Sequence, residues 1–305
     1  MSGAEKNSSV EQAFLDRFSE EFKGNGIQSR FSFLGLGFYS SSFSEKFGDR
    51  EIAGHGHDAD PVMATLKAAA ELVERRAVID FFSRNPEPIQ NSNGWAVGFT
   101  QKFSEEAAIR EALERHILIY TFLRSGWSEF LQVDEKETEM GKAWFLVSPY
   151  TQNGHFAGMV IYQDKNFPGI SFGYVCDRVG NEGTSLRWKH AIFEAVAFVE
   201  RVKETGGLKD SAGCVYAACR DWLMQPWVNR AWSRELYFYD LPEVTPKTRS
   251  GQLADYGLHY THVESGDFLP LFLQDDLKKS EIRAFVEEIT GRYGLSLSSE
   301  RMPIV

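Results

Sequence analysis

The sequence predicts an α/β (α+β) fold in which long helices pack on a mixed β-sheet. Three long helical segments, at about 61–82, 104–124 and 185–203, are separated by short strand-like segments rich in Val, Ile, Phe and Tyr. Two of these helices carry the same acidic unit inside apolar surroundings. Because no low-complexity linker interrupts the chain, we expect a single domain over 1–305, with a loosely ordered start over 1–10.

The composition is that of an ordinary globular protein. The chain has 305 residues, 43% hydrophobic and 25% charged, which is enough to bury a large core. A net charge of −10 argues against a general nucleic-acid or anionic-membrane partner, although it allows a local basic cleft for phosphate. No apolar run approaches the roughly 20 residues of a membrane span, and the polar start lacks a secretory signal.

The three cysteines predict a reducing environment. Cys176, Cys214 and Cys219 are odd in number and lack a Cys-x-x-Cys spacing. They are expected to be buried thiols rather than a disulfide set or a zinc site. A cytoplasmic protein is therefore predicted.

The N-terminal elements are predicted from caps and patterns. Ser8 and Glu11 form a capping box before an amphipathic helix, whose apolar positions are Val10, Phe14, Phe18 and Phe22. Residues 30–40 are expected to form a strand with a glycine break, and 50–54 a second short strand.

Two long helices follow. Asp60 and Pro61 suit the N-cap and first position of a helix that ends near Phe82, before "NPEP". The segment "GWAVGF" at 94–99 predicts a strand, and Ser104 is expected to cap a helix that ends near Arg124. Later strands are predicted at 143–148, 158–163, 170–177, 235–240 and 258–263, and helices at 185–203 and 279–293.

The most informative feature is a repeated Glu-x-x-Glu-Arg unit. It occurs as Glu71, Glu74 and Arg75 in one helix and as Glu111, Glu114 and Arg115 in the next. Each helix is apolar around most of its circumference, which is typical of a buried helix. The third helix looks like a weaker copy, aligned either through Glu194 or through the pair Glu200 and Arg201.

Buried carboxylates need a positive partner, because an ionised group without one costs several kcal/mol. Four glutamates converging from two helices would suit Mg²⁺, which prefers oxygen ligands and often shares them with substrate phosphates. The alternative is that Arg75 and Arg115 pair with these glutamates within or between the helices. The repetition inside apolar helices favours a metal–phosphate site.

A family resemblance rests on these same residues. The segment "SNGWAVGFTQKFSEEAAIREALERHILIYTF" resembles the central motif of the YcaO family, and "LKAAAELVERR" resembles that family's first acidic helix. The resemblance runs from about Gly54 to Arg124 and continues faintly over 170–201. It implies an ATP-binding fold whose members phosphorylate a peptide-backbone amide, so that an azoline ring or a thioamide can form.

The resemblance also implies a set of site residues. Mg²⁺ ligands carried over by position are Glu71, Glu74, Glu111 and Glu114. ATP-binding positions are Lys67, Ser92, Asn93, Arg115 and Glu194, together with the four glutamates. The expected cofactors are therefore ATP and Mg²⁺.

The chain departs from the family pattern at several positions. Lys67 stands in place of a serine, where it either touches a phosphate or neutralises Glu71 and disables the metal site. His116 replaces an aspartate, Ala197 a glutamine and Val199 an arginine. The tail "RMPIV" lacks the family's proline-rich end, which puts cyclodehydration in more doubt than ATP binding.

Other motifs are weaker. The stretch "GHGHD" at 54–58 is interpreted as a glycine-containing turn rather than a metal cluster, and "GLGFYSSS" at 35–42 as a strand bend rather than a phosphate loop. The tryptophan-rich stretch 220–236 predicts either a peptide-binding surface or core packing. Structural roles are expected for His190, His259 and His262.

Two functional hypotheses follow. The first is an ATP- and Mg²⁺-dependent enzyme that modifies backbone amides in ribosomal peptide natural-product maturation. The second is a catalytically degenerate YcaO-like scaffold subunit of a modification complex. Both predict a precursor peptide and a leader-binding partner protein, with no nucleic acid and no membrane, and leave a homo-oligomer open. An unrelated α/β protein with coincidental glutamates is the third alternative.

Overall fold

A computed structural model of the chain describes residues 11–18, 21, 26–48, 50–86, 92–166, 170–182, 187–204, 237–264, 266–269 and 276–297. The chain divides into two compact units. Unit 1 comprises residues 1–112 and 246–264, and unit 2 comprises residues 113–245 and 265–305. The predicted single domain over 1–305 stays a prediction. The expectations for the first ten residues and for the tryptophan-rich stretch at 220–236 fall outside the described residues.

Unit 1 begins with an antiparallel three-stranded sheet. Its strands are β1 (Gly26–Phe33), β2 (Leu36–Phe47) and β3 (Arg50–Asp58), in the order β1-β2-β3. The predicted single strand over 30–40 was wrong, because the chain reverses there. Leu34 and Gly35 both have positive φ, 54° and 74°, which is the geometry of a tight hairpin turn.

The N-terminal helix packs by its aromatic side. Residues 11–18 are helical, as predicted. Phe14 and Phe18 are buried and contact the rings of Phe99 and Phe43, with centroid distances of 5.7 Å and 4.9 Å. These contacts extend the apolar core that lies between α2 and the strands of unit 1.

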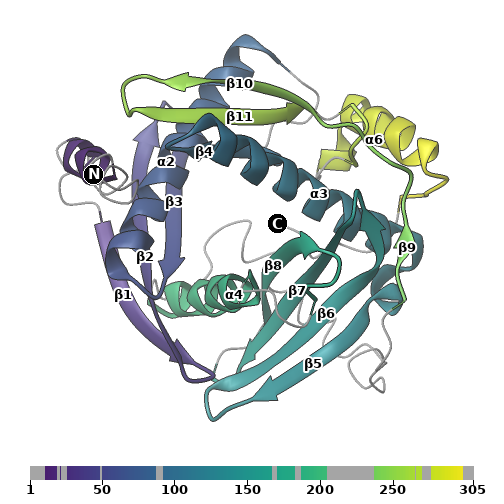
Figure 1. Cartoon of the computed structure of the whole chain (residues 1–305), viewed down its shortest axis with the longest axis horizontal. Coiled ribbons are helices and arrows are strands. Elements are labelled where there is room, and N and C mark those ends of the chain that lie inside the picture. The colour runs from purple at the N-terminus through teal and green to yellow at the C-terminus, as the bar shows by residue number, and fades with distance from the viewer. Residues whose placement is uncertain are drawn as a thin grey trace. The chain divides into compact units, whose positions relative to one another are not determined.

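Helix α2 (Pro61–Arg84) follows β3 and lies along it (Figure 1). The Asp60 side chain accepts hydrogen bonds from the backbone N–H groups of Val62 and Met63, so the predicted cap and helix are confirmed. The turn expected over 54–58 was wrong, because these residues belong to β3. Their glycines serve a different purpose: a Cβ at Gly56 would lie 2.0 Å from the carbonyl oxygen of Ala64, so only glycine lets α2 approach this closely.

A second sheet in unit 1 is built from distant segments. It contains β4 (Trp95–Gly98), β10 (Lys247–Leu253) and β11 (Leu258–Glu264) in the order β10-β11-β4, all antiparallel. Trp95 is stacked between the rings of Tyr260 and His262, at 5.6 Å and 4.7 Å. Phe81 and Phe82 of α2 contact the edges of this stack. The predicted strands at 94–99 and 258–263 are confirmed, whereas β10 was not predicted.

Helix α3 (Gln101–Ser125) starts earlier than expected. The Thr100 hydroxyl oxygen accepts a hydrogen bond from the backbone N–H of Phe103 at 3.2 Å, so Thr100 caps the helix. Ser104, the predicted cap, is instead a buried residue of the first turn, bonded to the Gln101 carbonyl and to Thr261. The boundary between the two units falls within α3, between Ala112 and Leu113.

Unit 2 is built on a five-stranded sheet (Figure 1). Its strands are β5 (Leu131–Glu137), β6 (Gly141–Gln152), β7 (His155–Asp164) and β8 (Ile170–Arg178), with β9 (Tyr239–Asp240) paired to β6. The β6–β9 pair is parallel and the others are antiparallel, so the sheet is mixed, as predicted. Its helical segments are α4 (Arg187–Glu204), α6 (Ser280–Arg292) and the short η1 (Gly126–Glu129) and η3 (Asp276–Lys278).

Helix α4 packs on β7 and β8. The predicted strands at 143–148, 158–163 and 170–177 and the helices at 185–203 and 279–293 are confirmed, with ends that differ by a few residues. The strand expected at 235–240 is reduced, within the described part, to two residues. Cys176 is buried and carries a free thiol. Across the described residues, no helix is both long and apolar enough to cross a membrane.

Candidate functional site

Glu71 of α2 is held in unit 1 by two contacts. Its Oε2 accepts a hydrogen bond from the backbone N–H of His55 in β3 at 2.9 Å. Its Oε1 accepts one from Arg75, one helical turn further on, at 3.0 Å. The side chain is therefore fixed between the strand and its own helix, and Arg75 offsets its charge.

Glu74 lies where negative charges gather. Burial raises the pKa of Glu74 well above the usual carboxyl value, and repulsion from Glu111 and Glu71 raises it further. Arg75 and a hydrogen bond with the Val97 backbone act in the opposite direction but do not cancel the rise. The net effect disfavours ionisation of Glu74, and a cation bound beside it would relieve this.

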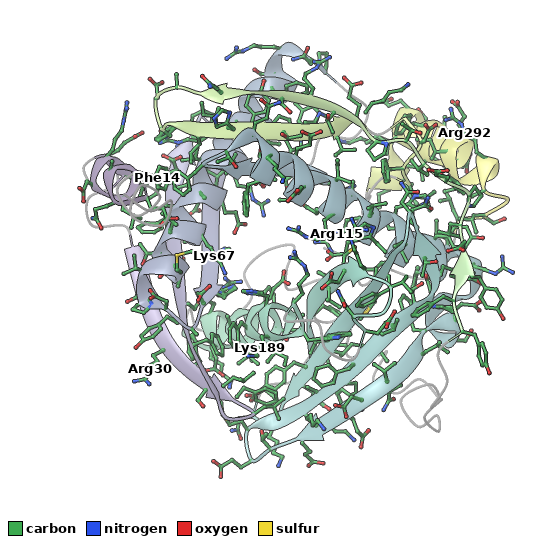
Figure 2. The ribbon with its side chains drawn as sticks, viewed as in Figure 1. Phe14, Arg30, Lys67, Arg115, Lys189 and Arg292 are labelled. Atoms are coloured by element: carbon green, nitrogen blue, oxygen red, sulfur yellow. The ribbon has the colours of Figure 1, made fainter. Side chains whose placement is uncertain are left out.

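Lys67 binds an acid that the sequence analysis did not assign to it. Its Nζ donates to Asp58 Oδ2 at 2.6 Å and to the backbone carbonyl of His57 at 3.2 Å. Figure 2 shows Lys67 on α2. Among the described residues, Lys67 has no hydrogen bond or ion pair with Glu71, and the charge of Glu71 is offset by Arg75 instead.

Arg115 of α3 is fixed inside unit 2. Its guanidinium carbon lies 4.2 Å from the centroid of the Tyr174 ring, and its Nη1 lies 3.5 Å from Glu114 Oε1. The side chains of Arg115 and Glu114 are only 12% and 13% exposed, so their charges are poorly screened by water. The cation–π contact supports the guanidinium from one side and fixes its plane.

Helix α2 contacts β3 through a glycine, an alanine and a glutamate. A Cβ at Gly54 would lie 2.2 Å from the carbonyl oxygen of Ala68, which is the close crossing point. Three residues after Ala68, Glu71 bonds the N–H of His55, the residue that follows Gly54. The carboxylate is thus held beside the crossing point.

Helix α4 contacts β8 in the same way. A Cβ at Gly173 would lie 1.9 Å from the carbonyl oxygen of Ala191. Three residues after Ala191, Glu194 Oε2 accepts a hydrogen bond at 3.2 Å from the N–H of Tyr174, the residue that follows Gly173. The two units therefore contain the same local arrangement of strand, helix and carboxylate.

This repetition favours one of the two alignments left open by the sequence. Glu194 occupies in α4 the place that Glu71 occupies in α2. Glu200 has a different environment, since Lys203 bonds it at 2.8 Å and also bonds Asp164 at 2.7 Å. The counterpart of Glu74 is Ala197, which is fully buried, so the α4 arrangement has no second acid at that position.

Ser92 and Asn93 lie in a turn before β4. The backbone N–H of Trp95 bonds the Ser92 carbonyl at 3.0 Å, and Gly94 has φ +71°. This turn delivers the chain into the strand whose Val97 backbone bonds Glu74. Both polar residues therefore lie directly before β4, within unit 1.

The carboxylates fit a hard divalent cation by their chemistry, because oxygen ligands suit Mg²⁺. The pKa of Glu74 is raised by burial and further by its acidic neighbours, and a cation would offset both effects. Over the described residues, however, no three His, Cys, Asp or Glu side chains lie close enough together to form a ready-made metal site. Binding of a cation would need side-chain adjustment.

Comparisons with known proteins locate the fold. No family model and no curated protein matches the sequence. Among solved structures, that of YcaO from Methanopyrus kandleri bound with AMPPCP and Mg²⁺ matches with a TM-score of 0.57 and 12% identity, over 86% of this chain and 90% of that one. The chain has the YcaO fold. The fold class and the resemblance predicted from the sequence are thereby confirmed.

Two further solved structures show weaker similarity. The Escherichia coli microcin synthetase McbBCD complex matches with a TM-score of 0.48 and 13% identity, over 80% of this chain and 88% of that one. A heterocyclase in complex with substrate and cofactor matches with a TM-score of 0.49 and 11% identity, over 83% of this chain and 51% of that one.

His116, a departure from the YcaO pattern, has a structural position. It is fully buried, and its Nδ1 accepts a hydrogen bond from the backbone N–H of Leu269 at 2.9 Å. Burial lowers the pKa of His116 to about 4, so the ring is neutral at pH 7.

Three partners of the site were missed by the sequence analysis. Asp58 was grouped with the histidines of the "GHGHD" stretch rather than with Lys67. The backbone N–H of His55 and the ring of Tyr174 gave no signal, because a main-chain donor and a packing aromatic are visible only once strand and helix are placed. The repeated Gly–Ala crossing could have been sought as glycines in strands that precede acidic helices.

Proposed function

We propose that this protein is a divergent YcaO protein that binds ATP with Mg²⁺ and activates a backbone amide of a peptide. The observation that carries the proposal is the raised pKa of Glu74 in unit 1, which is caused first by burial and then by repulsion from Glu111 and Glu71. The YcaO fold supports it, and the Methanopyrus kandleri YcaO structure is bound with AMPPCP and Mg²⁺.

Metal ligands in this proposal are Glu71, Glu74, Glu111 and Glu114. Glu111 and Glu114 are one helical turn apart on α3 and therefore share a helix face. Bound Mg²⁺ would offset phosphate charge during phosphoryl transfer. A cation bound to these glutamates would lower the pKa of Glu74 and keep its carboxylate ionised.

The remaining proposed positions act on the nucleotide. Arg115 presents a guanidinium held by Tyr174, which suits bidentate contact with phosphate oxygens. Glu194 keeps the Tyr174 backbone in place through its hydrogen bond. Lys67, Ser92 and Asn93 complete the proposed set, with Lys67 oriented by Asp58.

The type of product belongs to the proposal as well. An azoline-forming cyclodehydratase or a thioamide-forming protein of ribosomal peptide maturation would act on a precursor peptide, with a partner protein to bind its leader. A cytoplasmic location is proposed from the cysteine pattern. These points rest on the sequence resemblance.

A scaffold without catalysis is the second candidate. Two observations favour it: Lys67 is already paired with Asp58, and α4 has the buried Ala197 where the YcaO pattern has glutamine. Such a subunit would keep the fold and bind nucleotide without turnover.

One experiment separates the two. The purified protein is incubated with ATP, Mg²⁺ and a short peptide encoded beside its gene, with and without added sulfide as the sulfur donor, and ADP release and the peptide mass are followed. Amide activation predicts ADP release that depends on the peptide, with loss of one water from the peptide or exchange of one oxygen for sulfur. Nucleotide binding without either change, with the partner protein present, contradicts the enzyme proposal and favours the scaffold.

A further inference from the structure

Unit 1 contains a cleft whose lining includes none of the glutamates assigned to Mg²⁺. It has a volume of about 590 Å³, within the range of small-ligand pockets. Its lining comes from α2 and the β10–β11 hairpin, with Phe47 of β2 and Trp95 of β4. Phe81, Tyr256 and Tyr260 are half-buried and form an aromatic wall along it. Such a wall suits the flat apolar part of a small molecule.

Trp95 brings to the cleft a buried hydrogen-bond donor that lacks an acceptor. Its side chain is 1% exposed and is stacked between Tyr260 and His262, and its Nε1 makes no hydrogen bond within the part of the chain that the structure describes. An indole nitrogen can only donate, and buried donors in folded proteins are nearly always satisfied. A ligand, or a water that enters with it, can supply the missing acceptor.

Most of the charged side chains that line the cleft already have partners of opposite charge within unit 1. These pairs are Arg76 with Glu45 and Glu21, Arg249 with Glu264, and Asp255 with Arg17. The charge of a ligand therefore has to match the remaining two charged residues of the lining.

These two residues are Asp80 and Arg84, one turn apart on α2. Neither forms an ion pair with the other or with any further residue among those described, although an acid four residues before a base is a spacing that pairs on helices. Both side chains are exposed, so simple hydration is the competing explanation, and it predicts no ligand. Together with Phe81 between them, they offer one negative group, one positive group and an aromatic ring.

We propose that this cleft binds a free amino acid with an aromatic side chain. The ammonium group of the ligand contacts Asp80, its carboxylate contacts Arg84, and its ring packs on Phe81 and Tyr260. Side chains one turn apart have Cβ atoms about 5–6 Å apart, which leaves room for two opposite charges carried by one carbon atom. A residue within a peptide has at most one of these charges, so the ligand is the free amino acid. The proposal does not depend on the proposed function.

The test is a calorimetric titration of the full-length protein, without nucleotide, with a matched set of ligands. Phenylalanine, tyrosine or tryptophan should bind saturably. Phenethylamine and 3-phenylpropionate each lack one charge of phenylalanine and should bind about fivefold more weakly, a factor that corresponds to about 1 kcal/mol for an exposed ion pair. Alanine, which lacks the ring, should not bind. Absence of binding by all three aromatic amino acids, or equal affinity for phenylalanine and both analogues, would overturn the proposal.

Variants assign each charge to its partner. Asp80→Asn should weaken binding of phenylalanine and phenethylamine but not of 3-phenylpropionate. Arg84→Gln should weaken binding of phenylalanine and 3-phenylpropionate but not of phenethylamine. Neither change breaks an ion pair among the described residues, so both variants should fold. Lys102→Gln on α3, 86% exposed and absent from the cleft lining, is the control and should change nothing. Losses that are the same for all ligands would contradict the assignment.

Two further measurements locate the ligand. The indole N–H resonance of Trp95, assigned with Trp95→Phe, should shift when phenylalanine saturates the protein, and an unchanged resonance would place the amino acid elsewhere and overturn the proposal. Displacement of phenylalanine by Mg²⁺·AMPPCP would make the cleft part of a nucleotide site and overturn it as well. If phenylalanine binds and nucleotide does not, the amino-acid site stands and the proposed function falls.

Discussion

Buried His116 makes the protein's stability depend on pH. The pKa of His116 is lowered by burial to about 4, whereas the ordinary value is 6.5. The unfolded chain therefore binds a proton below about pH 6.5, and the folded chain does so only near pH 4. Stability is fully present above pH 6.5 and falls as the pH is lowered through this window.

The size of the effect follows from the two values. The difference is 6.5 − 4 = 2.5 units, which corresponds to about 3.4 kcal/mol at 1.36 kcal/mol per unit. Linkage gives a loss of about 2 kcal/mol between pH 7 and pH 5 from this residue alone. His262, with a pKa also lowered by burial to about 4, adds a similar contribution from unit 1.

The comparison variant is His116→Asn. Its Oδ1 can accept the Leu269 N–H bond but does not titrate in this range. Urea unfolding at pH 7 and pH 5 should show that wild type loses about 2 kcal/mol more than the variant. Equal losses in the two proteins would refute the reasoning, because His116 would then not be neutral and buried.

Three further predictions concern packing and charge. Gly173→Ala should lower the free energy of unfolding by about 2 kcal/mol or more, since its Cβ would lie 1.9 Å from a carbonyl oxygen of α4. In the control Gly37→Ala no atom lies within 4 Å of the added Cβ, so stability should not fall. Equal unfolding midpoints for the two variants would contradict this prediction. Arg76→Met should lower the free energy of unfolding by about 2–4 kcal/mol, because Arg76 is 18% exposed and bonds Glu45. Denaturant unfolding measures this loss, and an unchanged midpoint would contradict the prediction. Glu74→Gln should raise the thermal unfolding midpoint at pH 7 without ligand. The pKa of Glu74 is higher in the folded than in the unfolded protein, so the wild type loses stability as the pH rises, whereas glutamine does not titrate. A lower midpoint for the variant would contradict this prediction.

The sequence predicts most helices because their signals are local. Asp60 and Pro61 define the start of α2, and most apolar residues of α2 are buried or half-buried as their pattern requires, whereas Val62 in the first turn is exposed. The local signal does not decide which of two hydroxyl residues caps α3. Thr100 is the cap, whereas the Ser104 hydroxyl is buried and bonds that of Thr261.

Strands were missed where tertiary contacts override the pattern. The segment "KTRSGQL" of β10 and the segment "LQVDEKE" of β5 are too polar to predict strands, yet each pairs with a more apolar neighbour. The "GHGHD" stretch has turn-forming glycines, but Gly54 and Gly56 are there because α2 crosses the strand closely. Glycine signals close approach as well as turning.

The sequence predicted which residues belong to the candidate site but not which residues they contact. The acidic unit and Arg115 were recognisable from spacing, whereas the partners that orient them were not. Tyr174 supports Arg115 and donates its N–H to Glu194, and neither contact has a sequence signature. The local equivalence of Glu71 and Glu194 became visible only through their bonds to the strand backbone.

The central claim is that the glutamates of α2 and α3 bind a nucleotide through Mg²⁺. Calorimetric titration of Mg²⁺·AMPPCP into wild type, Glu74→Gln and the matched control Glu106→Gln tests it most directly, since Glu106 is an exposed glutamate of α3. We predict saturable binding to wild type and the control, dependence on Mg²⁺, and at least a tenfold loss, about 1.4 kcal/mol, in Glu74→Gln. Absence of binding to wild type, or equal binding to all three proteins, would contradict the claim.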